Sequence, residues 1–337
     1  MTIGRGAAIF GCDGPVMTAH EGDFFRDYDP FGFIIFARNV ENPDQLRRLT
    51  GDLRTAVGRD APVLIDQEGG RVQRLRAPHW REWTPPLDTV RRAGRHAARA
   101  MALRSMIIAA ELRDLGIDAN CAPVADIATE ATHPFLRNRC YGTDAATVTR
   151  IARAVADAHL AMGVLPVIKH LPGHGRATAD THHDLPTVTA SLADLTATDF
   201  APFRALNDLP MAMTAHVVFS AIDALRPATQ SADMIKVIRD QIGFDGLLMT
   251  DDLNMNALAG DLSDRTSRSM AAGCDIALHC KGDLAQMMAV AAAAGNMTAA
   301  AQSRASAVLA RRINPESVDI ADLEAEFSQL SGQGADG

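Results

Sequence analysis

Residues 169–186 hold the densest group of side chains in this chain that could take part in acid–base chemistry. The segment reads Lys-His-Leu-Pro-Gly-His-Gly-Arg-Ala-Thr-Ala-Asp-Thr-His-His-Asp-Leu-Pro and follows an apolar run directly. So many polar groups cannot be buried without partners, because each unpaired group loses its hydration. The pattern therefore predicts a loop at the end of a strand that holds titratable groups beside a site.

Asp180 and His182 are the pair in this segment best suited to proton transfer. A carboxylate beside an imidazole favours the charged ring and so raises its pKa. A histidine that titrates near neutral pH can donate a proton and take one back. The residues alone also allow an exposed loop histidine without a chemical role. Gly173 and Gly175 indicate a loop that can move.

Lys169 and His170 end the preceding apolar run, where the lysine could hold a hydroxyl group or an anion. The His170-x-x-x-His174 spacing, with two more histidines beyond, also allows a zinc site. Zinc is less favoured because His170 would end a strand while His174 follows a Pro-Gly turn, and no cysteine lies near enough in the sequence to complete the ligand set.

A second motif follows the apolar run that ends at Ile65 and reads Asp-Gln-Glu-Gly-Gly-Arg-Val-Gln-Arg over residues 66–74. Its glycines allow a sharp turn after a strand. Asp66 can accept hydrogen bonds from two sugar hydroxyl groups, and Arg74 offers a fork of donors. A structural Asp–Arg pair that only locks the loop is the alternative.

A third motif places Asp251 and Asp252 after the apolar residues 247–249. Adjacent strand residues point to opposite faces, so one carboxylate can enter a site while the other supports the loop. A carboxylate nucleophile opposite a proton donor is the arrangement of a retaining glycosidase. The residues alone do not choose between the two aspartates, and both could instead cap the next helix.

Composition narrows the class of protein. The chain has 337 residues, is 47% apolar and carries a formal charge of −8, which argues against a nucleic-acid-binding surface. It has no apolar stretch long enough for a membrane span and no signal-peptide pattern, so we expect a cytoplasmic protein. Its five widely spaced cysteines are expected to be reduced thiols in small apolar sites.

Eight short β-rich runs alternate with helical patterns along the chain. This rhythm predicts a parallel sheet covered by helices, and eight units favour a single-domain (β/α)8 barrel of the α/β class over an open sheet. We expect the barrel over residues 1–315, with one long helix over Leu87–Leu115, and a frayed polar tail over residues 316–337. The eight runs are Ala7–Phe10, Gly32–Phe36, Pro62–Ile65, Ala119–Val124, Leu165–Ile168, Pro210–Ala215, Gly246–Met249 and Asp275–Leu278.

Ionisable residues follow six of these eight runs. In a (β/α)8 barrel the C-terminal ends of the strands form the active-site face. Six ionisable strand ends on one rim therefore predict a catalytic site there. These residues are Asp66, Asp126, Lys169 with His170, His216, Asp251 and His279.

Four of these motifs, in order, resemble glycoside hydrolase family 3, and within it the bacterial cytoplasmic β-N-acetylglucosaminidases of peptidoglycan recycling. They are residues 66–74, Lys169-His-x-Pro-Gly-His-Gly175, Asp180-x-His182 and Thr250-Asp-Asp-Leu-x-Met255. The resemblance runs from about Ala7 to Ala310. Among its departures, Arg176 adds a positive charge to the loop, which leaves the closed geometry of the loop and the leaving-group preference open.

The resemblance implies a role for each matching residue. Asp251 would be the nucleophile, His182 the acid/base and Asp180 its partner. The sugar-binding residues would be Asp66, Arg74, Lys169, His170 and Arg139, the last from the Arg139-Cys-Tyr-Gly142 motif.

The activity implied by the resemblance is removal of terminal β-linked N-acetylglucosamine from muropeptides, with retention of configuration. It implies a carbohydrate substrate, no metal or organic cofactor, and no nucleic-acid or membrane partner, and we expect a monomer. A family 3 N-acetylglucosaminide phosphorylase or a related β-glycosidase is the closest alternative. A sugar-binding protein without catalysis and a metal hydrolase are the alternatives from other classes.

Overall fold

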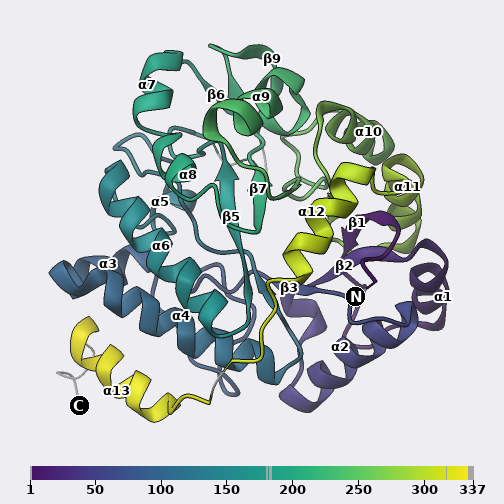
Figure 1. Cartoon of the computed structure of the whole chain (residues 1–337), viewed down its shortest axis with the longest axis horizontal. Coiled ribbons are helices and arrows are strands. Elements are labelled where there is room, and N and C mark those ends of the chain that lie inside the picture. Colours follow the sequence, from purple (N-terminus) through teal and green to yellow (C-terminus); the bar gives the residue numbers. More distant parts are fainter. Residues whose placement is uncertain (1, 180, 182–183, 316, 333–337) are drawn as a thin grey trace.

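The computed structural model describes residues 2–179, 181, 184–315 and 317–332 and forms a barrel of eight parallel strands (Figure 1). The strand order is β10-β7-β5-β4-β3-β2-β1-β11, and a parallel bridge between Met249 and Ile276 joins the two end strands. The predicted fold class is therefore confirmed, and each predicted run overlaps one strand. The barrel strands are β1 (Gly6–Phe10), β2 (Pro30–Ile35), β3 (Val63–Ile65), β4 (Ala119–Asn120), β5 (Leu165–Leu171), β7 (Met211–Thr214), β10 (Leu247–Met249) and β11 (Ala277–His279).

Helices surround the barrel, and most begin at a polar residue that caps the first turn. Asn42 accepts a hydrogen bond from the Gln45 N–H at the start of α2, and Asp144 accepts one from the Thr147 N–H at the start of α6. The helices are α1 (Ala19–Tyr28), α2 (Pro43–Val57), α3 (Pro86–Ala93), α4 (Ala97–Asp114), α5 (Pro134–Arg137), α6 (Ala145–Ala161), α7 (Leu192–Ala197), α8 (Ala201–Ala205), α9 (Ala232–Val237), α10 (Leu262–Ala272), α11 (Leu284–Ala294), α12 (Ala299–Leu309) and α13 (Ile320–Ser331).

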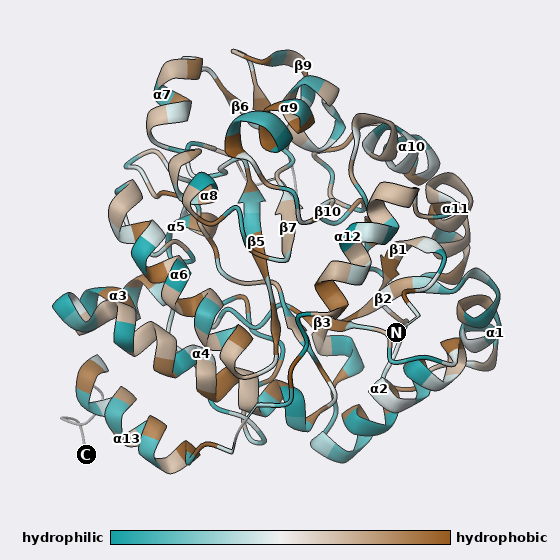
Figure 2. Cartoon of the chain, in the orientation of Figure 1, coloured by the Kyte–Doolittle hydropathy of each residue, from teal (hydrophilic) through white to brown (hydrophobic). Residues whose placement is uncertain are grey.

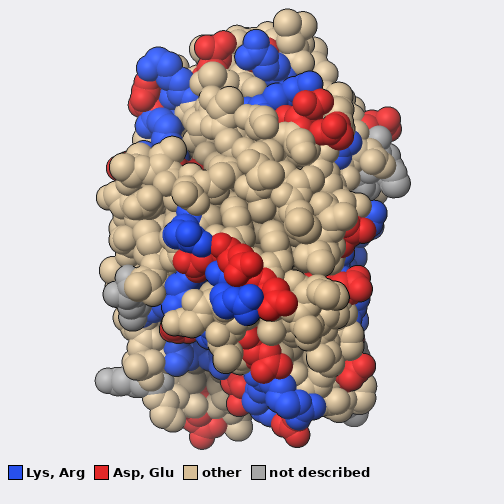
Figure 3. All heavy atoms as spheres, turned by 90° about the vertical axis from the view of Figure 1, so that its right-hand side faces the viewer, with Lys and Arg blue, Asp and Glu red and all other residues tan. Residues whose placement is uncertain are grey.

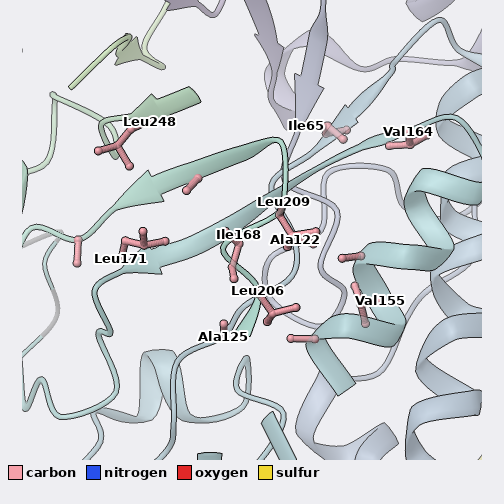
Figure 4. Close-up of a cluster of buried hydrophobic side chains, with 14 of the residues drawn as sticks. Ile65, Ala122, Ala125, Val155, Val164, Ile168, Leu171, Leu206, Leu209 and Leu248 are labelled. Atoms are coloured by element: carbon pink, nitrogen blue, oxygen red, sulfur yellow. The ribbon is translucent and has the colours of Figure 1, made fainter. Parts of the chain in front are cut away.

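Two apolar layers hold this architecture together because alternate strand residues point to opposite faces. Residues such as Ile9 and Val167 fill the barrel interior, whereas Phe10 and Ile168 belong to the layer between strands and helices. Figure 4 shows part of the outer layer, in which Ile168 and Val155 are labelled. The hydropathy colouring shows apolar strands in the middle and mixed helices around them (Figure 2).

Helix α12 lies across one end of the barrel (Figure 1). Its buried residues Ala301, Ala305 and Val308 join the cluster of side chains that fills the barrel interior. This end is therefore closed by apolar packing, which leaves the C-terminal ends of the strands to form the site.

The structure differs from two expectations. The expected helix over residues 87–115 is divided into α3 and α4, because the chain turns at Gly94, where φ is 51° and a residue with a side chain is strained. The expected frayed tail contains α13, which packs on α3 and α4 and buries Phe327 against Trp83 with a ring-centroid distance of 5.4 Å. The sequence did not predict this helix, because the residues around Phe327 are mostly polar and one aromatic residue was not enough to indicate packing.

A small second sheet lies beside the C-terminal end of β5. It consists of β6 (Thr187–Val188), β8 (Val218–Phe219) and β9 (Asp223–Pro227), in the order β6-β8-β9. The Val218 N–H donates to the Pro186 carbonyl oxygen at 2.9 Å. The segment that carries the histidine motif is therefore anchored by β5 before it and by β6 after it.

Acidic and basic side chains lie next to one another on the face shown in Figure 3. Charges of one sign do not dominate this face. Among the described residues, no helix combines the length and apolar character that crossing a bilayer requires. All five cysteines are buried and none is bonded to another.

Candidate active site

A hollow of about 240 Å³ opens at the C-terminal ends of the barrel strands. Six of the predicted site residues line it, namely Asp66, Arg74, Arg139, Lys169, His170 and Asp251. The other two, Asp180 and His182, lie outside the described residues. Thr181 between them is described and lines the same hollow, and its carbonyl oxygen accepts a hydrogen bond from the Ala257 N–H at 3.2 Å.

Asp66 stands between two cations at the end of β3. Lys169 Nζ lies 2.8 Å from Asp66 Oδ1, and Arg74 Nη2 lies 3.0 Å from Asp66 Oδ2. Burial alone would raise the pKa of Asp66, but Lys169 and Arg74 lower it below its usual value. The Asp66–Arg74 ion pair that could only lock the loop is therefore present. The same ionised carboxylate also lines the hollow, where it can accept hydrogen bonds from hydroxyl groups.

Glu68 is a buried carboxylate that pairs with Arg139 and Lys169, and no role was predicted for it from the sequence. Both its oxygens accept from the Arg139 guanidinium, at 2.8 and 2.9 Å, and Lys169 Nζ lies 2.6 Å from Oε1. Burial would raise the pKa of Glu68, but Arg139 and Lys169 lower it. Its place in the Asp66 motif is the only sequence signal that could have identified it, because its two partners come from distant segments.

The turn after Glu68 brings a buried arginine against the backbone. Gly69 has φ of 100°, and a Cβ there would lie 1.7 Å from Arg104 Nη2. Arg104 donates to the Glu68 carbonyl oxygen and to Thr89 Oγ1, both at 2.7 Å. Burial lowers the pKa of Arg104 to about 10. Gly69 is therefore required for the close approach that fixes Glu68.

Asp126 orients the next part of the site. Its Oδ2 lies 2.7 Å from His170 Nδ1, and its Oδ1 accepts from the His174 N–H at 2.7 Å. Burial would raise the pKa of Asp126, whereas His170 lowers it. The His170 ring is thus held by a carboxylate at Nδ1, while its Nε2 lies 3.4 Å from Arg139 Nη2.

His174 is a second histidine of the wall to which the sequence assigned only a zinc alternative. Its ring lies 5.5 Å from the His170 ring, and burial lowers its pKa to about 4, so it is neutral at neutral pH. Among residues 2–179, 181, 184–315 and 317–332, no group of three or more His, Cys, Asp or Glu is placed to hold a metal ion.

The two adjacent aspartates after β10 have different environments. The Asp252 N–H donates to Asp251 Oδ1 at 2.8 Å, while the Asp252 carboxylate accepts from the Asn254 and Cys280 N–H groups at 3.1 and 3.2 Å. Burial would raise the pKa of Asp251, but His216 and His170 lower it. Burial, together with the Asp251 charge, raises the pKa of Asp252 to about 6.

These environments suit Asp251 to nucleophilic attack, since it is ionised and has no partner for Oδ2 in the part of the chain that the structure describes. Asp252 is committed to the backbone of its own turn and of Cys280. Neither aspartate caps the following helix, because Asp261 does so.

The prediction that the six ionisable strand ends all form the rim of the site is only partly correct. Asp126 and His216 are completely buried behind the hollow and act on residues that line it. His279 points into the helical layer, with its ring 6.1 Å from Phe10 and its Nε2 3.3 Å from Gln286 Oε1. Cys280 lines the hollow in its place. A shift of one residue along a strand moves a side chain to the other face, which explains this difference.

Two features of the histidine segment were expected otherwise. A Cβ at Gly175 would lie 1.8 Å from the Ile127 carbonyl oxygen, so this glycine permits a close backbone approach. The Arg176 guanidinium lies 2.7 Å from Asp199 Oδ2 and 3.0 Å from Thr198 Oγ1, and Arg176 does not belong to the lining of the hollow. Its charge is therefore neutralised at the helical layer.

The arrangement provides an ionised carboxylate, a separate cluster of hydroxyl-binding groups and a neighbouring loop segment on one wall. Such a site can bind a sugar and attack it at a carbon atom within reach of Asp251.

The comparisons with known proteins agree with this chemistry. The sequence matches the Glycosyl hydrolase family 3 N terminal domain over residues 17–312. It is 38% identical to a β-hexosaminidase of Bordetella avium over 267 residues, which cover 75% of each chain. It is 35% identical to a β-hexosaminidase of Methylococcus capsulatus over 277 residues, which cover 81% of this chain and 82% of the other.

Solved structures show the same relationship. NagZ from Neisseria gonorrhoeae, in complex with N-trifluoroacetyl-D-glucosamine, superimposes with a TM-score of 0.83 at 27% identity, covering 98% of this chain and 97% of that chain. A family 3 β-N-acetylglucosaminidase from a Paenibacillus strain gives a TM-score of 0.84 at 28% identity, covering 96% of this chain and 67% of that chain. The chain therefore belongs to glycoside hydrolase family 3, and the relatives that it matches over most of their length are β-hexosaminidases.

Proposed function

We propose that this chain is a retaining exo-β-N-acetylglucosaminidase with Asp251 as nucleophile and His182 as acid/base. The observation that carries this proposal is the contrast between two neighbouring carboxylates. Both aspartates line the hollow. Asp251 accepts one backbone N–H and its pKa is lowered, whereas Asp252 accepts two backbone N–H groups and its pKa is raised to about 6. The relatives named β-hexosaminidase and β-N-acetylglucosaminidase support the amino-sugar substrate.

The reaction would take place in two displacements. Asp251 attacks the anomeric carbon and forms a glycosyl ester, while protonated His182 donates its proton to the departing oxygen. Neutral His182 then removes a proton from water, which attacks the anomeric carbon and releases both sugar and carboxylate. Each proton transfer contributes about 10²- to 10⁴-fold to the rate. Asp180 would keep the His182 ring charged and oriented.

Sugar binding would rest on the cluster at the ends of β3 and β5. Asp66, Lys169 and Arg74 present ionised groups at fixed distances to one part of the hollow. Arg139 and His170 complete this wall. Charge-assisted hydrogen bonds to hydroxyl groups are stronger than neutral ones, so the cluster favours a sugar ring over an apolar ligand.

The natural substrate would be a muropeptide, N-acetylglucosamine joined to 1,6-anhydro-N-acetylmuramyl peptide. Arg71 supports an anionic leaving group. It lines the hollow, is exposed, and places its guanidinium 3.9 Å from the centre of the Phe135 ring. Among the described residues it has no ion pair, unlike Arg74, Arg139 and Lys169. A guanidinium placed over an aromatic ring can still offer its N–H groups to a carboxylate.

Turnover of 4-nitrophenyl β-N-acetylglucosaminide beside the matching glucoside, with and without phosphate, tests the proposal. We expect rapid release from the amino sugar alone, β-N-acetylglucosamine as the first product by NMR, and no effect of phosphate. Formation of a sugar 1-phosphate would identify a phosphorylase instead, and an absence of turnover with both glycosides would contradict the proposed activity.

The role of His182 has its own test. His182→Ala should slow glycosides with poor leaving groups far more than aryl glycosides. Equal losses of rate on both kinds of substrate would contradict its role as acid/base.

A further inference from the structure

A buried chain of hydrogen bonds runs from the end of β7 to the turn that carries Asp251. Thr214 Oγ1 lies 2.8 Å from Thr229 Oγ1, Thr229 Oγ1 lies 2.7 Å from His216 Nδ1, and His216 Nε2 lies 3.1 Å from the Asp252 carbonyl oxygen. The side chains of Thr214, His216 and Thr229 have no exposed surface. Water therefore does not compete for these bonds.

The direction of these bonds follows from what each atom can do. A carbonyl oxygen only accepts, so His216 Nε2 carries the hydrogen that reaches Asp252. Burial lowers the pKa of His216, whereas Asp251 raises it. Thr229 Oγ1 lies 2.7 Å from Nδ1 and also 2.9 Å from the Ala215 carbonyl oxygen, and it has one hydrogen to donate. A neutral ring takes that hydrogen at Nδ1, whereas a charged ring donates from Nδ1 and leaves it for Ala215. In both arrangements Nε2–H points at Asp252.

Asp252 connects this chain of hydrogen bonds to Asp251. Its carbonyl oxygen accepts from His216, and its own N–H donates to Asp251 Oδ1 at 2.8 Å. The Asp252 carbonyl and N–H belong to the two peptide units on either side of its Cα. The Asp252 carboxylate accepts from the Asn254 and Cys280 N–H groups, so the residue is held between these two units. The position of the Asp251 carboxylate is thereby coupled to a residue from another strand.

We propose that His216 is a positioning residue for Asp251, acting through the Asp252 backbone, and that Thr229 and Thr214 hold its ring with Nε2–H directed at Asp252. The inference rests on the proposed function, because it treats Asp251 as the attacking group. His216 itself is not among the residues that line the hollow, so it acts on the position of the nucleophile rather than on the sugar. Misplacing a reacting group by a fraction of an ångström is enough to slow a displacement strongly.

Three variants separate the donor from the bulk of the ring. His216→Leu removes both nitrogens at similar volume, and His216→Gln keeps an N–H where Nε2 stands. Thr229→Val removes the hydroxyl that holds Nδ1. The matched control is Thr266→Val, which deletes a buried hydroxyl bonded to the Leu262 carbonyl oxygen within α10.

The measurements are kcat on 4-nitrophenyl β-N-acetylglucosaminide, the inhibition constant of N-acetylglucosamine, and a crystal structure of each His216 variant. We expect kcat to fall about 30- to 100-fold in His216→Leu and about 5-fold in Thr229→Val, with the inhibition constant within about 3-fold of wild type. His216→Gln should recover most of kcat, and Thr266→Val should match wild type.

A folded His216→Leu enzyme with wild-type kcat, or one that loses kcat and inhibitor affinity in proportion, would overturn the inference. Asp251 in an unchanged position in the His216→Leu crystal structure would also overturn it, whatever the activity. Wild type without turnover would instead contradict the proposed function, and the crystal structures would then decide the positioning claim by themselves.

Discussion

Lys169 and Glu68 face each other at the mouth of the barrel, with Nζ and Oε1 2.6 Å apart and only 2% of either side chain exposed. Because Glu68 also binds Arg139 through both oxygens, one buried carboxylate holds two of the proposed sugar-binding cations. Removing one partner of a buried ion pair leaves an uncompensated charge, which is far more damaging than removing a surface pair.

Glu68→Gln should therefore destabilise the protein by about 3 kcal/mol and lower kcat/KM on aryl β-N-acetylglucosaminides at least about 10-fold. Glu82→Gln is the control, since Glu82 forms an exposed pair with Arg76 at 2.7 Å and should change stability by less than about 1 kcal/mol. Chemical unfolding and steady-state kinetics provide both measurements. Wild-type KM and stability in Glu68→Gln would show that Glu68 does not hold the site.

Asp251 and Asp252 should affect stability with different dependence on pH. The pKa of Asp252 is raised from 3.8 to about 6, so the stability that its protonated form contributes is lost as pH rises through about 6. Asp252→Asn should therefore gain about 2 to 3 kcal/mol relative to wild type between pH 4 and pH 7.

The pKa of Asp251 is lowered, so the stability from its ionised form is present above the ordinary aspartate pKa and lost as pH falls. Asp251→Asn should therefore be less stable than wild type by a nearly constant amount over the same interval, because the folded and unfolded pKa values both lie below it. Thermal unfolding of the three proteins at pH 4.5 and pH 7.5 measures both differences. Parallel curves for the two variants would contradict the assigned environments.

Arg71 should select for a carboxylate on the leaving group. Arg71→Met keeps an apolar contact with Phe135 and removes the charge, so kcat/KM should fall about 3- to 10-fold on a carboxymethyl-coumarin β-N-acetylglucosaminide. On the uncharged methylumbelliferyl glycoside it should stay within about 2-fold. Equal changes on the two substrates would show that the arginine does not contact the anion. The exposed Arg268 on α10 provides a charge-removal control.

Helix α13 should contribute to the stability of the barrel. Phe327→Ala removes a fully buried ring that packs on Trp83, and such truncations cost about 3 to 5 kcal/mol. Gln329→Ala on the exposed side of the same helix should change the free energy of unfolding by less than about 0.5 kcal/mol. Urea unfolding measures the free energy of unfolding of both variants. A loss below about 1 kcal/mol in Phe327→Ala would mean that α13 does not unfold together with the barrel.

The sequence predicted the barrel because each strand is a short apolar run followed by a turn and a helix. That pattern reflects the burial of each segment by itself and does not depend on which strands lie next to it in the sheet. It placed Asp66 and Asp251 correctly just after β3 and β10, whereas β5 continues past Lys169 to Leu171. It misplaced His279, since the strand register decides which side of the barrel a residue faces and a single run does not reveal its register.

Features that depend on distant partners were not predictable. Arg176 pairs with Asp199, and Glu68 pairs with Arg139. In each pair the two residues come from segments that are far apart in the sequence. The chain of bonds through His216 likewise joins residues of two barrel units. The break at Gly94 shows a local signal that was present but was outweighed by the helical pattern around it.

Identification of the residue that becomes covalently linked to the sugar tests the central claim most directly. A 5-fluoro derivative of N-acetylglucosaminyl fluoride should slow release of the glycosyl enzyme, and peptide mass spectrometry then locates the label. We predict one sugar per chain, attached to Asp251 and absent from Asp251→Ala. A label on Asp252, or none in an enzyme that the reagent inactivates, would contradict the assignment of Asp251 as the nucleophile.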